Sequence, residues 1–361
     1  MVDSHVGLVG LGTALPAGSI SQEAAATICG GLVHGVQPET IAALYRRSGV
    51  SRRHCVILDG LNDTPPTFYP PADSSDHRGP TTAQRMRRYE LEASVLAETS
   101  CRRALASADV QPEQVTHLVT VSCTGFAAPG FDLALMSKAG FVPDVVRTHV
   151  GFMGCHGLLN GLRVANAFAR SDPNAVVVVC AVELCSLHQQ YTSEPQQIVA
   201  NALFADGAAA LIVRQAEGTS ALGHLCSQRS YVLPDTADMM SWRIGDHGFE
   251  MTLSPRVPDI IRSHLKQWLS KWLADCGLQS GEIETWAIHP GGPRILTAVA
   301  DSVGFDRALL RPSQSVLADY GNMSSPTIAF ILERLLRENS KGPCVLLAFG
   351  PGLTIEAALI A

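Results

Sequence analysis

A glycine-rich turn around Cys155 is the first place where this sequence offers a nucleophile. Three glycines surround the cysteine, at 151, 154 and 157, and the apolar positions that follow have the spacing of a helix. Cys155 is therefore expected at or just before a helix amino terminus, where free N–H groups and the helix dipole favour a thiolate. Such a setting can lower a cysteine pKa from about 8.5 to between about 3.5 and 7.5. The open alternative is a small buried cysteine that only packs.

His289 and Asn322 are two further polar residues at predicted element boundaries. His289 ends an apolar run before Pro-Gly-Gly-Pro, and a polar residue at the carboxyl end of a strand faces the crevice where α/β proteins hold ligands. Asn322 precedes two serines and Pro326, a combination typical of a helix start. The open alternatives are a core histidine bonded to backbone and a local Asx turn. Together with Cys155, these residues supply a nucleophile, a base and an oxyanion donor.

Alternating strands and helices must position these three residues. The predicted strands are 6–9, 115–123, 175–182, 208–213, 285–289 and 344–349. The predicted helices are 82–108, 157–170, 257–276, 293–303 and 326–338. The nearly all-valine run 175–182 is typical of a strand buried on both faces. This alternation predicts an α/β protein with mostly parallel or mixed sheets.

Two stretches interrupt the alternation. Residues 60–81 contain five prolines, which predict a long surface loop. Residues 215–247 lack a clear period, and we expect the domain boundary there. The predicted halves are residues 1–220, with the cysteine, and 221–361, with the histidine and asparagine.

Composition narrows the class of protein. Hydrophobic residues make up 46% of the 361 residues and charged residues 17%, against a usual charged share of about 25%. This excludes disorder for most of the chain and predicts enough buried surface for a homo-oligomer. The net charge of −6 provides no basic field for a nucleic-acid backbone.

Cysteine spacing and hydropathy limit the cofactors and location. The ten cysteines include no Cys-x-x-Cys pair, which zinc ribbons, thioredoxin motifs and iron–sulfur runs require. No apolar run approaches the roughly 18 residues of a membrane helix, and the amino terminus does not resemble a secretory signal. We expect a cytoplasmic protein with reduced thiols and without a metal or a membrane span.

Seven sequence blocks resemble the type III polyketide synthases, the chalcone-synthase-like branch of the thiolase superfamily. They are CTGFAAPG (123–130), GFMGCHGLLNGLR (151–163), ELCSLH (183–188), ALFADGAAALIV (202–213), WAIHPGGP (286–293), DYGNMSSP (319–326) and AFGPGLT (348–354). The resemblance implies a thiolase-like, layered αβαβα fold built from two similar halves. It also implies a homodimer that uses coenzyme A thioesters and no metal or redox cofactor.

The resemblance also implies roles for single residues. Cys155 matches the acyl-accepting nucleophile, His289 the catalytic histidine, and Asn322 the catalytic asparagine. Phe204 matches the gatekeeper phenylalanine between the coenzyme A tunnel and the cavity, and Ser324 matches a cavity serine.

Matches outside the catalytic trio concern the partner subunit, the cavity floor and coenzyme A. Ala128 matches a loop that helps to form the partner's cavity wall, and Gly350 lies in the turn that shapes the floor where cyclisation occurs. Arg47 matches a cationic position that meets coenzyme A, while Arg46 and Arg53 are weaker candidates. The alternative for all three arginines is a solvated surface position.

Five cavity positions depart from the plant pattern. Met251 replaces the second gatekeeper phenylalanine, Trp242 a glycine, and His188 a threonine. Cys123 and Thr124 fill positions usually held by Thr and Ser. The tryptophan is expected to obstruct part of the cavity, which leaves the starter, the number of extensions and the cyclisation mode open.

The implied reaction is iterative decarboxylative condensation of malonyl-CoA onto an acyl-CoA starter held on Cys155. An imidazolium–thiolate pair of His289 and Cys155 is expected to carry it, followed by closure to a pyrone or to a resorcinol- or phloroglucinol-type ring. Two alternatives stay open: a ketoacyl synthase III-like enzyme that acts once on a carrier-protein thioester, and a non-catalytic homologue that serves as a binding partner.

Overall fold

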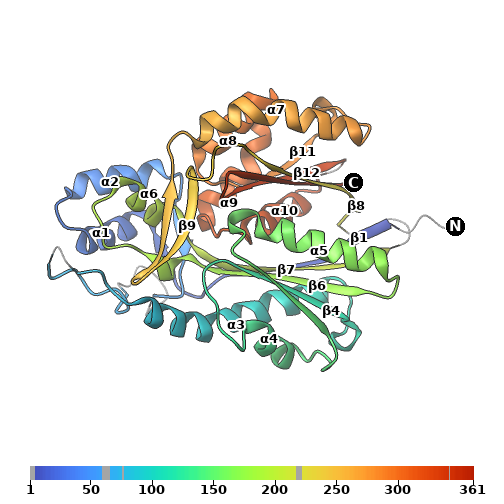
Figure 1. Cartoon of the computed structure of the whole chain (residues 1–361), viewed down its shortest axis with the longest axis horizontal. Helices are drawn as coiled ribbons and strands as arrows, with labels where there is room; N and C mark the ends of the chain where they lie inside the picture. The colour runs from blue at the N-terminus through green and yellow to red at the C-terminus, as the bar shows by residue number, and fades with distance from the viewer. Residues whose placement is uncertain (1–4, 59–65, 75–76, 217–221, 341) are drawn as a thin grey trace.

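The computed structural model describes residues 5–58, 66–74, 77–216, 222–340 and 342–361. Its elements stack in five layers, helix–sheet–helix–sheet–helix (Figure 1). This is the layered α/β arrangement that the sequence resemblance implies. The predicted boundary at residues 220 and 221 lies at or beside residues outside the described part of the chain, as does much of the proline-rich stretch before 66.

The first sheet has the strand order β1-β7-β6-β4-β5 and mixes parallel with antiparallel neighbours. Its strands are β1 (His5–Ala14), β4 (His117–Ser122), β5 (Val146–Gly151), β6 (Val176–Leu184) and β7 (Asp206–Ala216). Every residue of β6 after the first is buried, because helices cover both faces of this sheet.

The second sheet has the order β11-β12-β13-β8 and is also mixed. Its strands are β8 (Leu225–Val232), β11 (Thr285–Ile288), β12 (Cys344–Gly350) and β13 (Thr354–Ile360). Two ribbons stand apart from both sheets: β2 (Ser19–Ser21) with β3 (Arg52–His54), and β9 (Met240–Gly245) with β10 (Gly248–Leu253).

Helices form the other three layers (Figure 1). The outer helices are α3 (Thr82–Ser107) and α4 (Phe131–Ala139) on the first sheet, and α7 (Val257–Asp275) and α8 (Pro293–Val303) on the second. The helices between the sheets are α5 (Gly157–Ser171) and α10 (Thr327–Arg337), with α9 (Arg311–Tyr320) leading into α10. At one end lie α1 (Gln22–Leu32), α2 (Pro38–Arg47) and α6 (Pro195–Leu203).

A close approach of α5 to the first sheet sets the position of the turn that precedes this helix. A Cβ on Gly161 would lie 2.8 Å from a Val121 methyl and 2.9 Å from a Val179 methyl. Glycine therefore lets the helix backbone sit directly on β4 and β6. The Cys155 turn, just ahead of α5, is held at the carboxyl end of β4 as a result.

Most of the predicted strands and helices are confirmed to within a few residues, since each is a long apolar or strongly periodic segment. The expectation of an irregular stretch over 215–247 was wrong, because it contains β8 and β9. β8 is an edge strand with the polar sequence LCSQRSYV, so no apolar run marks it. β1 was also too short in the prediction, which ended it at Val9 rather than Ala14.

No helix in the described ranges combines the length and the apolar character that crossing a membrane requires.

Candidate active site

Cys155 lies in a single 3₁₀ turn, Gly154–His156, directly ahead of α5, as the sequence predicts. The cysteine is buried, with 7% of its surface exposed. Gly154 adopts a φ of +71°, and a Cβ there would lie 2.5 Å from Cδ of Pro351. The turn therefore requires glycine for its conformation and for its space.

His289 follows directly after β11 and continues the hydrogen bonding of this strand to β12. Its backbone N–H donates to the carbonyl of Leu347 at 2.8 Å, while its ring is 1% exposed. Neither ring nitrogen has a hydrogen-bond partner among the described residues. The alternative of a core histidine bonded to backbone is therefore wrong, and the ring nitrogens remain available to a reacting group.

Asn322 lies in the turn between α9 and α10. Its backbone N–H donates to the carbonyl of Leu203 and its carbonyl accepts from the N–H of Ala205, each at 2.9 Å, so the asparagine is fixed beside Phe204. Its side-chain Oδ1 accepts from the backbone N–H of Ser324 at 2.8 Å. This is the Asx turn that the sequence left open, and it leaves the Nδ2 hydrogens to donate elsewhere.

The structure brings Cys155, His289 and Asn322 together around one small cavity of about 20 Å³. Apolar side chains line the rest of it, among them Phe204, Met240, Met251, Leu253, Ile295 and Phe349. A second cavity of about 20 Å³ lies beside Cys155, lined in part by Cys123, Thr124, Trp242, Ser324 and Pro351. Because a water molecule needs about 10–15 Å³, each of these spaces holds about one water.

Burial favours the neutral forms of Cys155 and His289. It raises the pKa of the Cys155 thiol to about 11, although hydrogen bonds from Ser324 and Asn322 lower that pKa. Burial also lowers the pKa of His289 to about 3, and the nearby His156 acts in the same direction. Both shifts run against the low thiol pKa and the imidazolium–thiolate pair expected from the sequence, because desolvation outweighs the helix end.

An aromatic wall closes the side of the cavity formed by the β9–β10 ribbon. The indole of Trp242 donates from Nε1 to the carbonyl of Cys123 at 2.7 Å and meets His188 and Phe249 edge-on. His188 stacks on Phe249 with ring centres 4.1 Å apart. The obstruction expected from Trp242 is thus present and held in place by hydrogen bonding and packing.

Both ring nitrogens of His188 form hydrogen bonds that hold it in this wall. Its Nε2 donates to the carbonyl of Thr124 at 2.7 Å, and its Nδ1 accepts from the N–H of Phe249 at 3.0 Å. Burial lowers the pKa of His188 to about 3, so the ring is neutral. With both nitrogens occupied, His188 shapes the cavity and has no free nitrogen for proton transfer.

Sequence reasoning missed a buried carboxylate behind the nucleophile. Glu183 is fully buried and accepts from the hydroxyls of Thr124 and Ser325, each at 2.7 Å, and from the N–H of Cys123 at 3.0 Å. Burial raises its pKa. The available signal was a charged residue near the end of an otherwise apolar strand. Cys185 also lines the cavity beside Cys155.

Gly350 lies behind the cavity. A Cβ on it would be 2.3 Å from the His156 ring, and its neighbour Pro351 lines the cavity instead. Phe204 and Met251 line both spaces beside Cys155, and Ser324 lines one of them.

The three candidate coenzyme A arginines separate into two kinds. Arg53 is 1% exposed, and its Nη1 donates to the carbonyls of Asn201 and Phe204 at 2.5 and 2.9 Å. This burial contradicts both the proposed contact of Arg53 with coenzyme A and the alternative of a solvated surface position, because the guanidinium lies inside the protein at the end of α6. Arg46 and Arg47 are exposed on the last turn of α2, where a phosphate can reach them.

Comparisons with known proteins cover almost the whole chain. Residues 3–217 match the family described as chalcone and stilbene synthases, N-terminal domain, and residues 224–361 match the C-terminal domain. The chain is 32% identical over 360 residues to the alpha-pyrone synthesis polyketide synthase-like Pks18 of Mycobacterium tuberculosis, covering 97% of this chain and 89% of the relative. It is 32% identical over 374 residues to the 1,3,6,8-tetrahydroxynaphthalene synthase of Streptomyces peucetius, covering 100% and 94%.

Solved structures agree with these sequence relatives. The crystal structure of PKS-I from the brown alga Ectocarpus siliculosus superposes with a TM-score of 0.91 at 27% identity, over 99% of this chain and 98% of that one. The tetrahydroxynaphthalene synthase of Streptomyces coelicolor gives a TM-score of 0.86 at 27% identity, over 98% and 99%. The second of these is titled a bacterial type III polyketide synthase.

Proposed function

The chain belongs to the chalcone and stilbene synthase family, the type III polyketide synthases, and we propose that Cys155, His289 and Asn322 carry out that family's condensation in it. The observation that carries this assignment is the single cavity that all three side chains line, with both His289 nitrogens unpartnered. As a member, the chain is an acyltransferase with the thiolase-like fold, and it uses coenzyme A thioesters without a cofactor. The comparisons lend no support to the carrier-protein or non-catalytic alternatives.

Loading the starter requires Cys155 to lose its proton. Because burial favours the neutral form of both groups, His289 takes the thiol proton as sulfur attacks the carbonyl of the acyl-CoA. The carbon–sulfur bond to coenzyme A breaks, and the proton returns from His289 to the departing coenzyme A thiolate. The acyl group is then held as a thioester on Cys155.

Extension begins when malonyl-CoA loses carbon dioxide. The bond to the carboxylate breaks and its electron pair remains on the α-carbon, giving an enolate whose oxygen carries the charge. His289 and the Nδ2 hydrogens of Asn322 stabilise that oxygen, a contribution of about 3–4 kcal/mol per donor. The α-carbon attacks the Cys155 thioester, the carbon–sulfur bond breaks, and the released Cys155 thiolate takes a proton from solvent, because His289 has already given the loading proton to coenzyme A.

We infer a short acyl starter, few extensions and an α-pyrone product. The two spaces beside Cys155 hold about one water each, and the Trp242 wall is fixed on one side. A short chain closes to a pyrone when an enol oxygen attacks its own thioester and releases the thiol. A relative named for alpha-pyrone synthesis supports this choice of ring.

We also propose a homodimer formed through β5. This strand is an edge of the first sheet, and one face around it is apolar: Phe126, Leu133, Val146, Phe152 and Met153 are each 37–51% exposed. An edge strand flanked by exposed apolar side chains needs a cover. A second copy seated there would bring the exposed loop at Ala128 toward the neighbouring site, as the family resemblance implies.

Three further assignments complete the proposal. Arg46 and Arg47 bind the phosphates of coenzyme A from the end of α2. The chain divides into a first half that carries the cysteine and a second that carries the histidine and asparagine, near residue 220. The protein works in the cytoplasm, where its ten cysteines stay reduced.

Mass spectrometry of the acyl-enzyme tests the catalytic assignment. Incubation with a short acyl-CoA and no malonyl-CoA is expected to add one acyl mass to the Cys155 peptide, and Cys155→Ala is expected to abolish it. Cys226→Ser, a change at an exposed cysteine, is the matched control and keeps the adduct. Asn322→Ala is expected to keep acylation while slowing malonyl-CoA decarboxylation about 10²–10³-fold. An adduct on Cys123 or Cys185 instead would contradict the assignment.

A further inference from the structure

Two turns from different halves of the chain pack closely against each other beside Cys155. They are the Cys155 turn, Gly154–His156, and the Pro351 turn between β12 and β13. The ring of Pro351 occupies the space that a Cβ on Gly154 would fill, and the ring of His156 occupies the space that a Cβ on Gly350 would fill. The Cys155 turn and the Pro351 turn therefore depend on two glycines, one in each turn. His156, the residue directly after the nucleophile, is the side chain that enters the second half.

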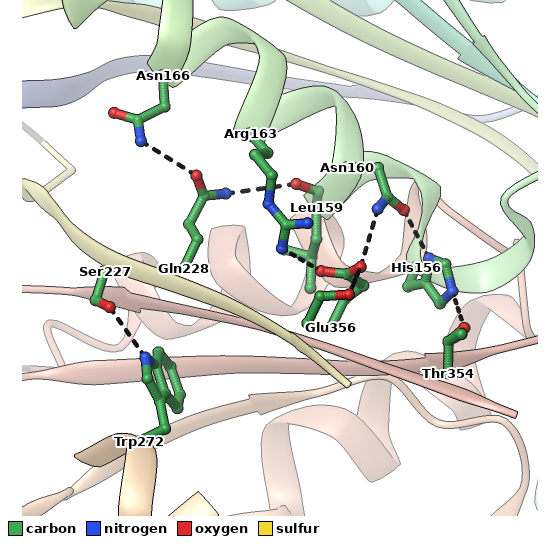
Figure 2. A network of polar contacts seen from close by, with 11 residues as sticks. His156, Leu159, Asn160, Arg163, Asn166, Ser227, Gln228, Trp272, Thr354 and Glu356 are labelled. Carbon is green, nitrogen blue, oxygen red and sulfur yellow. Dashed lines mark hydrogen bonds and ion pairs between the residues drawn. The ribbon is translucent and has the colours of Figure 1, made fainter. Parts of the chain in front are cut away.

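Hydrogen bonds hold the His156 ring at both nitrogens (Figure 2). Asn160 donates from Nδ2 to Glu356 at 3.1 Å, so its Oδ1 is the atom that accepts from Nδ1–H of His156, at 2.6 Å. Nε2 of the neutral ring is then the acceptor for the hydroxyl of Thr354. Thr354 pairs with Gly350 across the turn that contains Pro351, so its bond to Nε2 connects His156 to the cavity floor.

A buried carboxylate anchors this arrangement. Glu356 is 3% exposed and accepts from Arg163 and Ser230, each at 2.5 Å, as well as from Asn160. Arg163 belongs to α5 of the first half, and Ser230 belongs to β8 of the second. The helix that follows the nucleophile is thus tied to the second sheet through one fully satisfied ionic group.

We propose that His156 is a positioning residue that, through Thr354, fixes the Cys155 turn against the Pro351 turn and so sets both the reactivity of Cys155 and the room for the growing chain. Cys155 and Pro351 line the same cavity, whereas His156 lies behind it, against Gly350. A shift between the two turns therefore changes the distance from the sulfur to the cavity floor. This inference rests on the proposed role of Cys155 as the acyl-bearing nucleophile.

Thr354→Val tests the hydrogen bond between His156 and Thr354 with the smallest change of side-chain shape. The valine keeps the volume but removes the hydroxyl that donates to Nε2 of His156. We expect kcat for condensation to fall about ten- to hundredfold, with the KM for malonyl-CoA within about twofold, because a misplacement near 1 Å can cost a factor of about 10². Longer products are expected as the floor loosens. Thr354→Ser, which keeps the hydroxyl, is expected to restore the wild-type rate and product length.

Asn166→Ala is the matched control. Asn166 donates to Gln228 at 3.3 Å at the far end of the same polar network, away from the Cys155 turn (Figure 2). It is expected to leave kcat and product length unchanged. If Thr354→Val does not fold, His156→Phe carries the test, because phenylalanine fills the ring space beside Gly350 and removes both hydrogen bonds. Wild-type kcat and products in whichever of these two variants folds would overturn the proposal.

Alkylation of Cys155 by iodoacetamide separates this inference from the proposed function. The reaction needs no condensation, and Thr354→Val is expected to speed it relative to wild type, Thr354→Ser and Asn166→Ala, because loosened turns expose a thiol that is otherwise buried. If that order is found but the wild type elongates no acyl-CoA, the positioning role stands and the proposed function fails. If the wild type makes polyketide and Thr354→Val matches it in kcat and in alkylation, only the positioning role fails.

Discussion

At the scale of single residues, the sequence predicts the position of Cys155 but not its pKa. The glycine-rich turn before a periodic apolar stretch places the cysteine correctly at the start of α5. The sequence does not show how deeply that helix start is buried. Desolvation depends on side chains from elsewhere in the chain, such as Phe204 and Trp242, so the direction of the pKa shift was missed.

The pH dependence of alkylation tests this proton directly. With the thiol pKa raised to about 11, the thiolate fraction of Cys155 rises about tenfold for each pH unit between pH 7 and 10. The iodoacetamide rate constant for the Cys155 peptide, followed by mass spectrometry in the wild type, is expected to rise in the same way. A rate that is flat from pH 6 to 8 would instead show the imidazolium–thiolate pair with His289.

At the scale of elements, prediction succeeded where a segment is long and apolar and failed where it is short and polar. The all-valine β6 and the long helices α3 and α7 are visible in the sequence. The strand β9, which carries Trp242, was read as part of an irregular stretch, and its partner β10, which carries Met251, was not predicted as a strand. Family resemblance nevertheless placed both residues at the cavity, because it compares positions and does not depend on periodicity.

Trp242→Gly tests how this ribbon limits the product. The change removes the indole that closes the cavity and its bond to the Cys123 carbonyl, so we expect longer products or acceptance of bulkier acyl-CoA starters. Liquid chromatography with mass spectrometry of products from a panel of starters measures the effect. Ile244→Gly, at an exposed position of the same strand, controls for loosening of the ribbon itself. An unchanged product profile in Trp242→Gly would count against the wall as the limit.

At the scale of the whole molecule, composition predicts an oligomer, and we place its proposed interface at the β5 edge. Five of the exposed large apolar side chains belong to β5 or to segments next to it. Sequence alone does not reveal that these side chains are exposed, because Phe126 and Phe152 are separated along the chain and their rings lie together only in the folded protein. The layered fold, by contrast, follows from the alternation of strands and helices together with the family resemblance.

Val146→Asp tests the proposed dimer. A carboxylate in the middle of an apolar interface is costly to desolvate, so the variant is expected to sediment as a monomer where the wild type sediments at twice the chain mass. Analytical ultracentrifugation over a range of concentrations makes the comparison. Lys271→Asp, on the outer helix α7, introduces the same side chain away from β5 and is expected to stay dimeric. A wild type that sediments as a monomer would contradict the interface.

The measurement that bears most directly on the whole account is the product spectrum of purified protein given malonyl-CoA and short acyl-CoA starters, with Cys155→Ala alongside. The wild type is expected to release α-pyrones built from one starter and a few malonyl units, and Cys155→Ala is expected to release none. The same pyrones from Cys155→Ala would show that the nucleophile is misassigned. Elongation of a carrier-protein thioester, with coenzyme A thioesters left untouched, would contradict the proposed reaction.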